Sequence, residues 1–266
     1  MENRATRDVR GVLHTPPDDA WSLHRFDPGP RLAPYTVWHW IVFWDLRGRE
    51  PHHQATLPHP APHLVVEEGG AWLYGPLRER FDRTLEGAGR AVGLRFKPGG
   101  IRPLLQAPVS SIRDRRVPAG VLPGLDAEAL TRAVTAAGDL QDAVAAMEAA
   151  VIPLLPAEPD PEIELADRAV TMLAEDRGIT RVSELAERLS LSVRSVQRLF
   201  ADQVGLGPSW VIRRYRLHEA AAHATAGGEV DWARLAVTLG YYDQAHLVRD
   251  FTAAVGTAPA RYAAGR

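Results

Sequence analysis

The sequence of 266 residues contains no cysteine, which excludes disulfide bridges, cysteine nucleophiles, thiolate-bound zinc and iron–sulfur clusters. It has no run of about 18 apolar residues and no apolar segment behind its first arginines, so we expect neither a membrane span nor an export signal. Lysine is almost absent as well, since Lys97 is the only lysine among 31 basic residues. The rest is ordinary globular composition, 45% hydrophobic and 24% charged, and it predicts a soluble, cytoplasmic protein.

The composition of the sequence changes twice along the chain. Its length is that of two domains of about 100–150 residues each. The first part carries five of the seven tryptophans. An alanine-rich stretch with helical spacing follows, with a break at Gly138-Asp139 and several prolines after it. We predict a β-rich domain over residues 1–125, a helical connector with a Pro-rich linker over 126–156, and a helical domain over 157–266.

Four segments of the first part have the composition of β-strands. The strongest is TVWHWIVFWD, Thr36–Asp45, which is aromatic and β-branched and too short to span a membrane. Turns rich in Gly and Pro separate the shorter candidates, which are His63–Glu67, Ala71–Tyr74 and Ala91–Phe96. Short strands at this spacing predict a small β-barrel or sandwich.

Alternation along Thr36–Asp45 places three tryptophans and Val42 on one face of that strand. Such a face either lines a pocket for an apolar or aromatic small molecule or packs in the core, and the sequence leaves both open. Leu94 and aromatic residues of neighbouring strands would close the pocket. The candidate ligand-binding residues are Trp38, Trp40, Trp44, Tyr74 and Phe96.

The last third of the chain contains an internal repeat. The apolar residues of 185–191 recur 50 residues later in 235–241, and those of 196–208 recur 51 residues later in 247–259. Each copy has an apolar helix, a short turn, a side chain suited to N-capping (Ser192 or Asp243) and a second helix. We expect the second helices to bury Val196, Leu199 and Phe200 in the first copy and Leu247 and Phe251 in the second. This is the pattern of a helix-turn-helix written twice, in which the second helix can enter the major groove of DNA.

The second helix of each unit has a polar face that does not pack in the core. That face either contacts DNA bases or is an ordinary solvent-exposed surface. Arginine can bond guanine and glutamine can bond adenine through two hydrogen bonds each, worth about 1–3 kcal/mol of discrimination. Residues 181–216 hold seven arginines and three acidic residues, a basic region that the formal net charge of −2 conceals. The candidate DNA-binding residues are Ser192, Arg194, Ser195, Gln197, Arg198, Arg214, Gln244, Ala245, His246 and Arg249.

A helix predicted from Ser209 to about Ala224 separates the two units. Its length of about 24 Å makes it a spacer that could present the two reading helices to successive major grooves, about 34 Å apart. We expect phosphate contacts from Arg214 and from the neighbouring arginines, which are Arg188, Arg213 and Arg216.

Residues 165–264 resemble the AraC/XylS-type DNA-binding domain through the segments VSELAERLSLSVRSVQRLF, VGLGPSWVIRRYRLHEA and WARLAVTLGYYDQAHLVRDFTAAVGTAPARY. The resemblance implies an all-α tandem helix-turn-helix in a bacterial transcription regulator. Its partners would be double-stranded promoter or operator DNA, RNA polymerase and a second copy of the chain. Asp243 and His246 depart from many members of the family. The base-contacting positions implied are Arg194, Gln197, Arg198, Gln244, Ala245 and Arg249.

The first part is similar, less closely, to the cupin-like sensor domain of a subgroup of these regulators, through WDLRG, LPHP and GLRFKPGGIRPLL. The resemblance implies an α+β multidomain protein. Its cupin-like, barrel-type first domain would bind a small-molecule effector or mediate dimerisation, and a helical connector would lead to the DNA-binding domain.

An enzymatic alternative is a metal-dependent cupin-type enzyme fused to a DNA-binding domain. The residues that suggest it are His52, His53, His59, His63, Glu67 and Glu68. They contain no His-x-His pair, and the chain has no nucleophile elbow, P-loop or metalloprotease motif. We therefore expect loop and edge histidines, no metal, no cofactor and no enzymatic activity.

Overall fold

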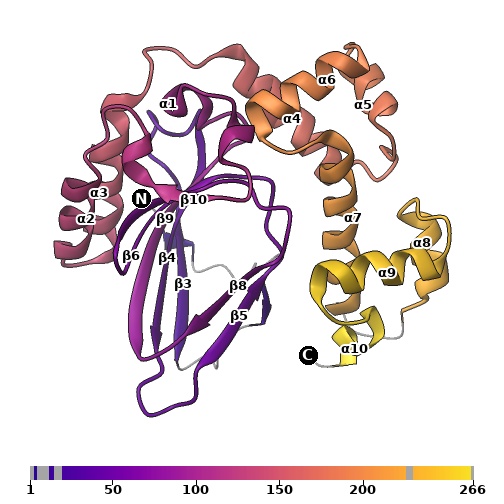
Figure 1. Ribbon diagram of the computed structural model, residues 1–266, viewed down its shortest axis with the longest axis horizontal. Coiled ribbons are helices and arrows are strands. Elements are labelled where there is room, and N and C mark those ends of the chain that lie inside the picture. The colour runs from indigo at the N-terminus through magenta and orange to yellow at the C-terminus, as the bar shows by residue number, and fades with distance from the viewer. Residues whose placement is uncertain (1–2, 5–11, 15–19, 226–229, 265–266) are drawn as a thin grey trace.

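The computed structural model describes residues 3–4, 12–14, 20–225 and 230–264. A β-rich part and a helical part lie beside each other, with α4 (Pro161–Glu175) where they meet (Figure 1). The predicted α+β architecture, with strands first and helices last, is confirmed. None of the described helices is long and apolar enough to cross a lipid bilayer.

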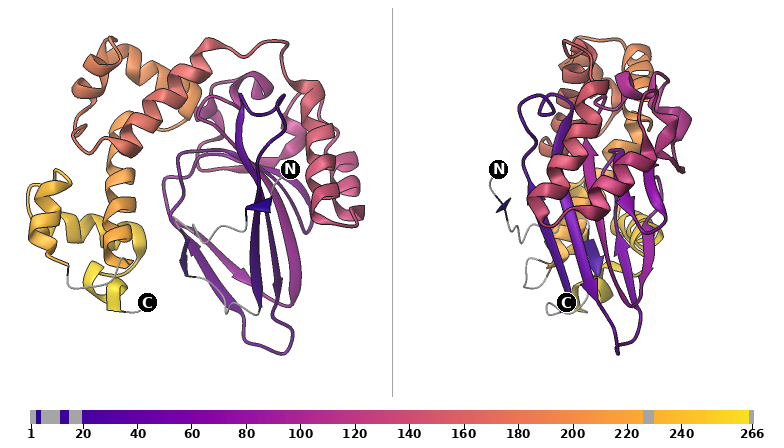
Figure 2. Two further views of the ribbon diagram at one scale, coloured as in Figure 1. Left: turned by 180° about the vertical axis from the view of Figure 1, so that it is seen from behind. Right: turned by 90° about the vertical axis from the view of Figure 1, so that its left-hand side faces the viewer.

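Two antiparallel sheets make up the β-rich part (Figure 2). The strand order of the seven-stranded sheet is β1 (Asn3–Arg4), β3 (Trp21–Phe26), β4 (Thr36–Asp45), β9 (Ala88–Phe96), β6 (His63–Glu67), β7 (Gly70–Tyr74) and β10 (Arg116–Pro118). The order of the three-stranded sheet is β2 (Val12–His14), β5 (His52–Thr56) and β8 (Phe81–Leu85). The two sheets stay separate, so this part is an open two-sheet structure rather than a closed barrel.

The predicted strands are present, and β4 and β6 have the predicted bounds. The alternation along β4 separates two environments, as its burial shows. His39 and Ile41 are fully buried on one face, whereas Trp38, Trp40 and Val42 on the other face keep part of their surface accessible. The face with His39 joins the main core, and the tryptophan face is directed toward the smaller sheet.

The helices predicted as a connector are instead part of the main core of the β-rich part. α2 (Ala127–Ala136) and α3 (Leu140–Val151) separate at Gly138-Asp139, as expected, and each begins with an aspartate N-cap. Their apolar faces cover the larger sheet in one cluster with its strands. This cluster includes Leu64, Val92, Leu94, Phe96, Leu130, Val134, Val144 and Met147. The apolar spacing of α2 and α3 predicts helices but not their packing partner. It therefore could not show that they pack on the larger sheet rather than connect two domains.

Short helical segments complete the β-rich part: α1 (Arg102–Leu105) and the 3₁₀ turns η1 (Val109–Ile112), η2 (Ala119–Val121) and η3 (Ile152–Leu154). The helical part then runs through α4, α5 (Val182–Arg188), α6 (Val193–Leu199), the π-helical turn η4 (Phe200–Val204), α7 (Pro208–Thr225), α8 (Trp232–Thr238), α9 (Gln244–Val255) and α10 (Pro259–Ala264). The long helix α7 contains the predicted spacer.

Glu148 on α3 connects the helical cover, which consists of α2 and α3, to the β-rich part through hydrogen bonds. One of its carboxylate oxygens accepts a hydrogen bond from the Gly29 N–H at 2.8 Å and lies 3.1 Å from Nε2 of the fully buried His39. The hydrogen bond with His39, followed by that from Gly29, lowers the pKa of the Glu148 carboxyl. A carboxyl with a lowered folded-state pKa stabilises the fold above its unfolded-state pKa, and this contribution is lost as the pH falls through the folded-state value.

Replacing Glu148 with glutamine is therefore expected to lower the free energy of unfolding by about 1–3 kcal/mol at neutral pH, because the His39 and Gly29 groups lose an ionised acceptor. The difference from the unmodified protein should shrink in acid. Chemical denaturation at several pH values measures it. Glu128→Gln is the matched control, since the Glu128 side chain is 91% exposed in a surface pair with Arg132 at 3.6 Å. Equal effects of the two substitutions would contradict the anchoring role.

The two parts of the molecule touch near α1 and at the smaller sheet. Near α1, the Gly99 N–H donates to the Gln203 carbonyl at 2.8 Å, and Arg102 pairs with Asp202 at 3.0 Å. At the other end, residues of the smaller sheet share an apolar cluster with α7 and the helices beyond it. The buried members at this end are Leu13, Ala55, Leu57, Leu217, Ala220 and Ala224. The helical part is therefore in direct contact with the region of α1 and with the smaller sheet.

Candidate DNA-binding surface and ligand cavity

The first helix-turn-helix unit consists of α5, a turn and α6. Leu185 and Ala186 of α5 pack against Val196, Leu199 and Phe200, and all five side chains are buried. Ser192 is the N-cap of α6, because its hydroxyl accepts the Ser195 N–H at 3.1 Å. The cap and the apolar spacing thus orient α6 with its polar residues outward.

The second unit repeats this construction with α8 and α9. Leu235 and Ala236 pack against the fully buried Leu247 and Phe251. Asp243 is the N-cap of α9, and its carboxylate accepts the His246 N–H at 2.7 Å. A carboxylate at this position also complements the positive end of the helix dipole.

The backbone of the two units repeats as closely as the side chains do. The turn residues Ser190 and Gly240 both have positive φ, 54° and 70°. Both turns close with an i to i−5 hydrogen bond of 2.9 Å, from Leu191 to Ala186 and from Tyr241 to Ala236. The second helices likewise end at glycines with positive φ, 81° at Gly205 and 87° at Gly256. The 50-residue repeat in the sequence is therefore a structural repeat.

Most of the predicted reading residues lie on the surface. Ser192, Arg194, Gln197 and Arg198 are exposed on the first unit, and Ser195 beside them is half-buried. On the second unit the exposed residues are Gln244, Ala245, His246 and Arg249. The His246 ring also contacts Tyr241 of the same unit, with the two ring centroids 5.1 Å apart. The described segments of the β-rich part leave the side chains of both reading faces exposed.

Arg214 corrects an expectation, since its side chain does not reach the surface. It is 3% exposed, it donates a hydrogen bond to the Arg78 carbonyl of the β-rich part, and it lies over the Trp210 ring at 4.5 Å. Burial, with the nearby charge of Arg213, lowers the pKa of its guanidinium to about 10. Arg214 therefore holds the two parts together, and the predicted phosphate contact is not supported.

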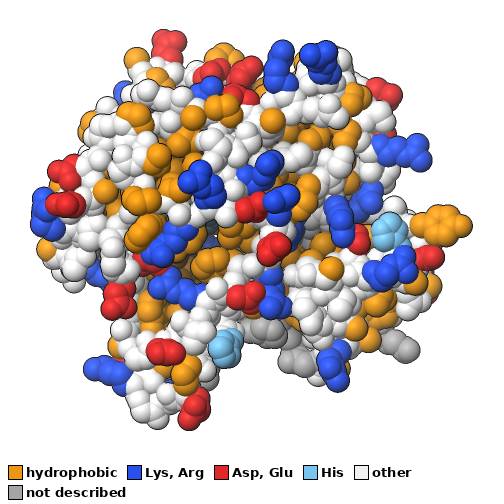
Figure 3. All heavy atoms as spheres, in the orientation of Figure 1, with side chains coloured by type: hydrophobic (Ala, Val, Ile, Leu, Met, Phe, Trp, Pro, Cys, Tyr) orange, Lys and Arg blue, Asp and Glu red, His pale blue; other side chains and the backbone are white. Residues whose placement is uncertain are grey.

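The other arginines expected at phosphates also have partners within the protein. Arg213 pairs with Asp250 at 2.7 Å, Arg216 donates to the Thr180 carbonyl at 2.9 Å, and Arg188 pairs with Asp176. Figure 3 shows the result on one face of the molecule, where blue Lys and Arg side chains are interspersed with red Asp and Glu. Within the described residues, by contrast, Arg194, Arg198 and Arg249 take part in no ion pair or hydrogen bond. Their side chains are exposed.

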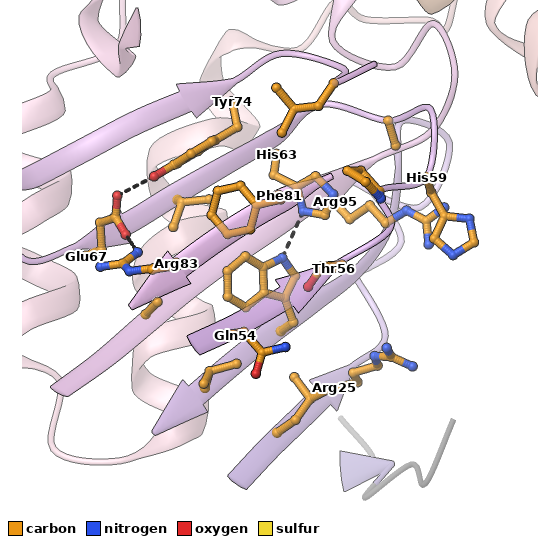
Figure 4. A pocket seen from close by; sticks show the side chains of 18 of the residues that line it. Arg25, Gln54, Thr56, His59, His63, Glu67, Tyr74, Phe81, Arg83 and Arg95 are labelled. Atoms are coloured by element: carbon orange, nitrogen blue, oxygen red, sulfur yellow. Dashed lines mark hydrogen bonds and ion pairs between the residues drawn. The ribbon is translucent and has the colours of Figure 1, made fainter. Parts of the chain in front are cut away.

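A cavity of about 490 Å³ lies between the two sheets of the β-rich part (Figure 4). Its walls come from β3, β4, β6, β7 and β9 of the larger sheet and from β5 and β8 of the smaller one. Four of the predicted residues line it, namely Trp38, Trp40, Trp44 and Tyr74. Phe96 and Leu94 do not, because they lie on the opposite face of β9, fully buried against the helical cover. The prediction that Phe96 faces the pocket is wrong.

Small residues on β9 make room for the tryptophans of β4. Trp40 pairs with Gly93, Val42 with Ala91, and Trp44 with Gly89 across the two strands. A Cβ atom on Gly93 or Gly89 would overlap the indole ring of the facing tryptophan. The alternation Gly-x-Ala-x-Gly along β9 is a sequence signal of this face that the pattern of apolar residues alone did not reveal.

The charged side chains of the cavity lie toward two opposite ends, and the polar residues Gln54, Thr56 and His63 lie between them (Figure 4). At one end Glu67 accepts a hydrogen bond from the Tyr74 hydroxyl at 2.6 Å and pairs with Arg83 and Arg116. Arg95 and His59 lie at the other end. Sequence reasoning missed Arg95, because a lone arginine in a strand gives no signal of the direction in which it points.

The histidines of the cavity are held neutral. His63 accepts a hydrogen bond at Nδ1 from the Trp40 indole at 3.0 Å, and burial, with the charge of Arg95, lowers its pKa to about 3. Burial and Arg95 lower the pKa of His59 as well. Of the four histidines considered as metal ligands, His59 and His63 line the cavity, whereas His53 is exposed. No group of three or more His, Asp or Glu side chains in the described segments is arranged to hold a metal ion.

Comparison with known proteins agrees with this geometry. Residues 185–265 match the sequence model of a helix-turn-helix domain, and residues 24–118 match a domain of unknown function, DUF6597. No curated protein matches the chain.

Among solved structures, the chain is similar to the C-terminal domain of the response regulator AraT from Geobacillus stearothermophilus, with 21% identity, coverage of 40% of this chain and 87% of that one, and a TM-score of 0.36. An apo form of ToxT from Vibrio cholerae shows 12% identity, coverage of 85% and 96%, and a TM-score of 0.40. ToxT with a bound unsaturated fatty acid shows 11% identity, coverage of 92% and 91%, and a TM-score of 0.39.

These TM-scores are below 0.5, so the assignment depends on the sequence match and on the geometry of the two units. Two capped recognition helices with exposed polar faces define a DNA-binding transcription regulator. Its C-terminal helices form, more particularly, an AraC-type helix-turn-helix domain.

Proposed function

We propose that the protein binds specific DNA sequences through both helix-turn-helix units and that a small molecule in the cavity between the sheets modulates this binding. The first unit supplies Ser192, Arg194, Ser195, Gln197 and Arg198. The second supplies Gln244, Ala245, His246 and Arg249, a face with fewer long donors, so we expect it to discriminate fewer base pairs. This role requires no catalytic chemistry.

The observation that supports modulation is a stack of two imidazole rings between the cavity and α7. The ring of His59 on the cavity wall lies parallel to that of His218 on α7, with centroids 4.5 Å and planes 14° apart, and Tyr215 of the same helix lies 6.2 Å from His59. On its other sides α7 pairs with α9 through Arg213 and Asp250. A change at the cavity wall therefore reaches the helix that spaces the two reading surfaces.

The domain division that suits this function has two units rather than three. The helical cover, residues 126–152, belongs with the sensor because it shares the core of the larger sheet. The DNA-binding domain begins at about residue 157. We propose that the protein works in the cytoplasm, that it acts with RNA polymerase at promoters, and that a second copy of the chain can bind an adjoining site.

Arg198→Ala is expected to weaken binding to the preferred DNA sequence about tenfold or more, while binding to random DNA changes little, because the guanidinium reads a base rather than the backbone. The preferred sequence is first selected from a random duplex pool with the full chain. Affinities for that duplex and for a scrambled one are then measured at fixed salt concentration.

Arg132→Ala is the control, since Arg132 is a 70% exposed arginine on α2, outside the helix-turn-helix units. It should leave both affinities unchanged. If Arg198→Ala reduces the affinity for both duplexes by the same factor, Arg198 contacts only phosphate and the proposed reading role fails.

A further inference from the structure

Arg95 carries a half-buried positive charge that no described residue pairs with. It extends from β9 into the cavity, where its Nε is buried without a hydrogen-bond acceptor. In the described part of the chain, no hydrogen bond or ion pair reaches its guanidinium, which lies over the Trp38 ring at 4.5 Å. Burial lowers its pKa to about 10, so it remains cationic at neutral pH. A half-buried cation whose buried Nε has no acceptor destabilises the fold, and this points to a missing anionic partner.

The charges around Arg95 do not neutralise it. Arg25 adds a second guanidinium, 4.7 Å from the same Trp38 ring. The two cavity histidines, His59 and His63, are neutral. The carboxylate that acts on Arg95 from the helical part is Asp167, which lies 4.0 Å from the ammonium of Lys97. The opposite end of the cavity differs, because there both Arg83 and Arg116 already form ion pairs with Glu67.

The space in front of Arg95 is mostly apolar and aromatic. The rings of Trp38, Trp40 and Phe81 line it from both sheets. Aliphatic side chains and the polar side chains of Gln54, Thr56 and His63 complete the lining. Flat walls of this kind favour a flat, apolar body, and a volume of about 490 Å³ is within the range of small-molecule sites. The fork of a guanidinium matches a carboxylate, which it can bind through two parallel hydrogen bonds.

We propose that the cavity binds an aromatic carboxylic acid, with its carboxylate on Arg95 and its ring system between Trp38, Trp40 and Phe81. This inference rests on the proposed function, in which the cavity is the sensor site, and it adds the chemical class of the effector. The carboxylate end lies beside His59 and its stack with His218, so the charged group of the ligand meets the wall that touches α7.

The test compares two probes of the same shape, biphenyl carboxylate and the neutral biphenyl carboxamide, by titration calorimetry on the full chain. The unmodified protein should bind the acid about tenfold or more tightly than the amide, because a hydrogen bond to a charged group is stronger than one between neutral groups. Arg95→Gln should abolish that preference by weakening the acid alone. Arg83→Gln, at the opposite end of the same cavity, should preserve it.

A stability measurement separates a binding role of Arg95 from a structural one. If Arg95 binds a ligand and has no structural partner, Arg95→Gln should leave the free energy of unfolding unchanged or raise it. Adding the acid should then raise the melting temperature of the unmodified protein but not that of Arg95→Gln. A large loss of stability in Arg95→Gln would overturn the inference.

The failure of this inference and the failure of the proposed function give different results. Equal affinity of the unmodified protein for acid and amide, unaffected by Arg95→Gln, would overturn the carboxylate site and leave the cavity as a sensor of neutral molecules. Absence of binding by either probe, and by a wider panel of aromatic acids and amides, would overturn both.

Discussion

Replacing Leu247 with aspartate is expected to unfold the second helix-turn-helix unit and to abolish specific DNA binding by the full chain. Leu247 is 0% exposed and packs in a small helical core with Phe251 and Leu235. An aspartate there would be a buried carboxylate without a partner, and together with the lost leucine packing it should cost about 4 kcal/mol or more. Far-ultraviolet circular dichroism during thermal unfolding and affinity for the selected duplex measure the two effects.

Thr252→Asp is the matched control for folding, because it introduces the same charge into the same helix at an exposed position. It should leave the unfolding transition close to that of the unmodified protein. Val196→Asp is the other comparison, since Val196 holds the equivalent buried position in the first unit and is also 0% exposed. Loss of one unit by Leu247→Asp but not by Val196→Asp would show that the two copies are not energetically equivalent.

The DNA-binding units were predictable because the residues that determine them are local. A helix cap depends on a few neighbouring residues, so Ser192 and Asp243 could be identified before any contact was known. The repeated apolar spacing likewise identified Val196 and Leu247 as buried. The same holds for β4, whose period of two gave the cavity-facing tryptophans directly.

The errors concern contacts between segments far apart in the sequence. The prediction for Phe96 depends on its aromatic ring and its place on a neighbouring strand, but the pairing of Gly93 with Trp40 decides which face of β9 points into the cavity. Arg214 is on the correct helix, yet the docking of the β-rich part covers it. Composition alone cannot supply either fact.

Strands with polar sequences were missed for a related reason. β5 (HHQAT) and β8 (FDRTL) have no alternation of apolar residues strong enough to predict a strand. They pair with each other and cover the tryptophan face of the larger sheet, and this creates the cavity. The sequence therefore indicated one wall of the site and left the opposite wall and Arg95 to the structure.

Gly93→Ala is expected to disrupt this cavity. A Cβ atom on Gly93 would overlap the ring of Trp40, so the indole must leave its position and give up the hydrogen bond from its Nε1 to His63. Overpacking of this kind costs about 1–3 kcal/mol, and the displaced ring has only the cavity to enter. We expect a lower melting temperature, an altered tryptophan emission spectrum and at least about tenfold weaker binding of biphenyl carboxylate, since 1.4 kcal/mol corresponds to that factor.

Gly120→Ala tests whether these effects are specific to the cavity. Gly120 is exposed, and a Cβ atom there would meet nothing within 4 Å. This substitution removes the same backbone freedom from the unfolded chain without crowding the folded one, so its melting temperature should equal or slightly exceed that of the unmodified protein. The emission spectrum and the calorimetric titration should not change. If Gly93→Ala behaves like Gly120→Ala, then Trp40 does not lie across Gly93, and the tryptophan wall of the cavity is wrongly placed.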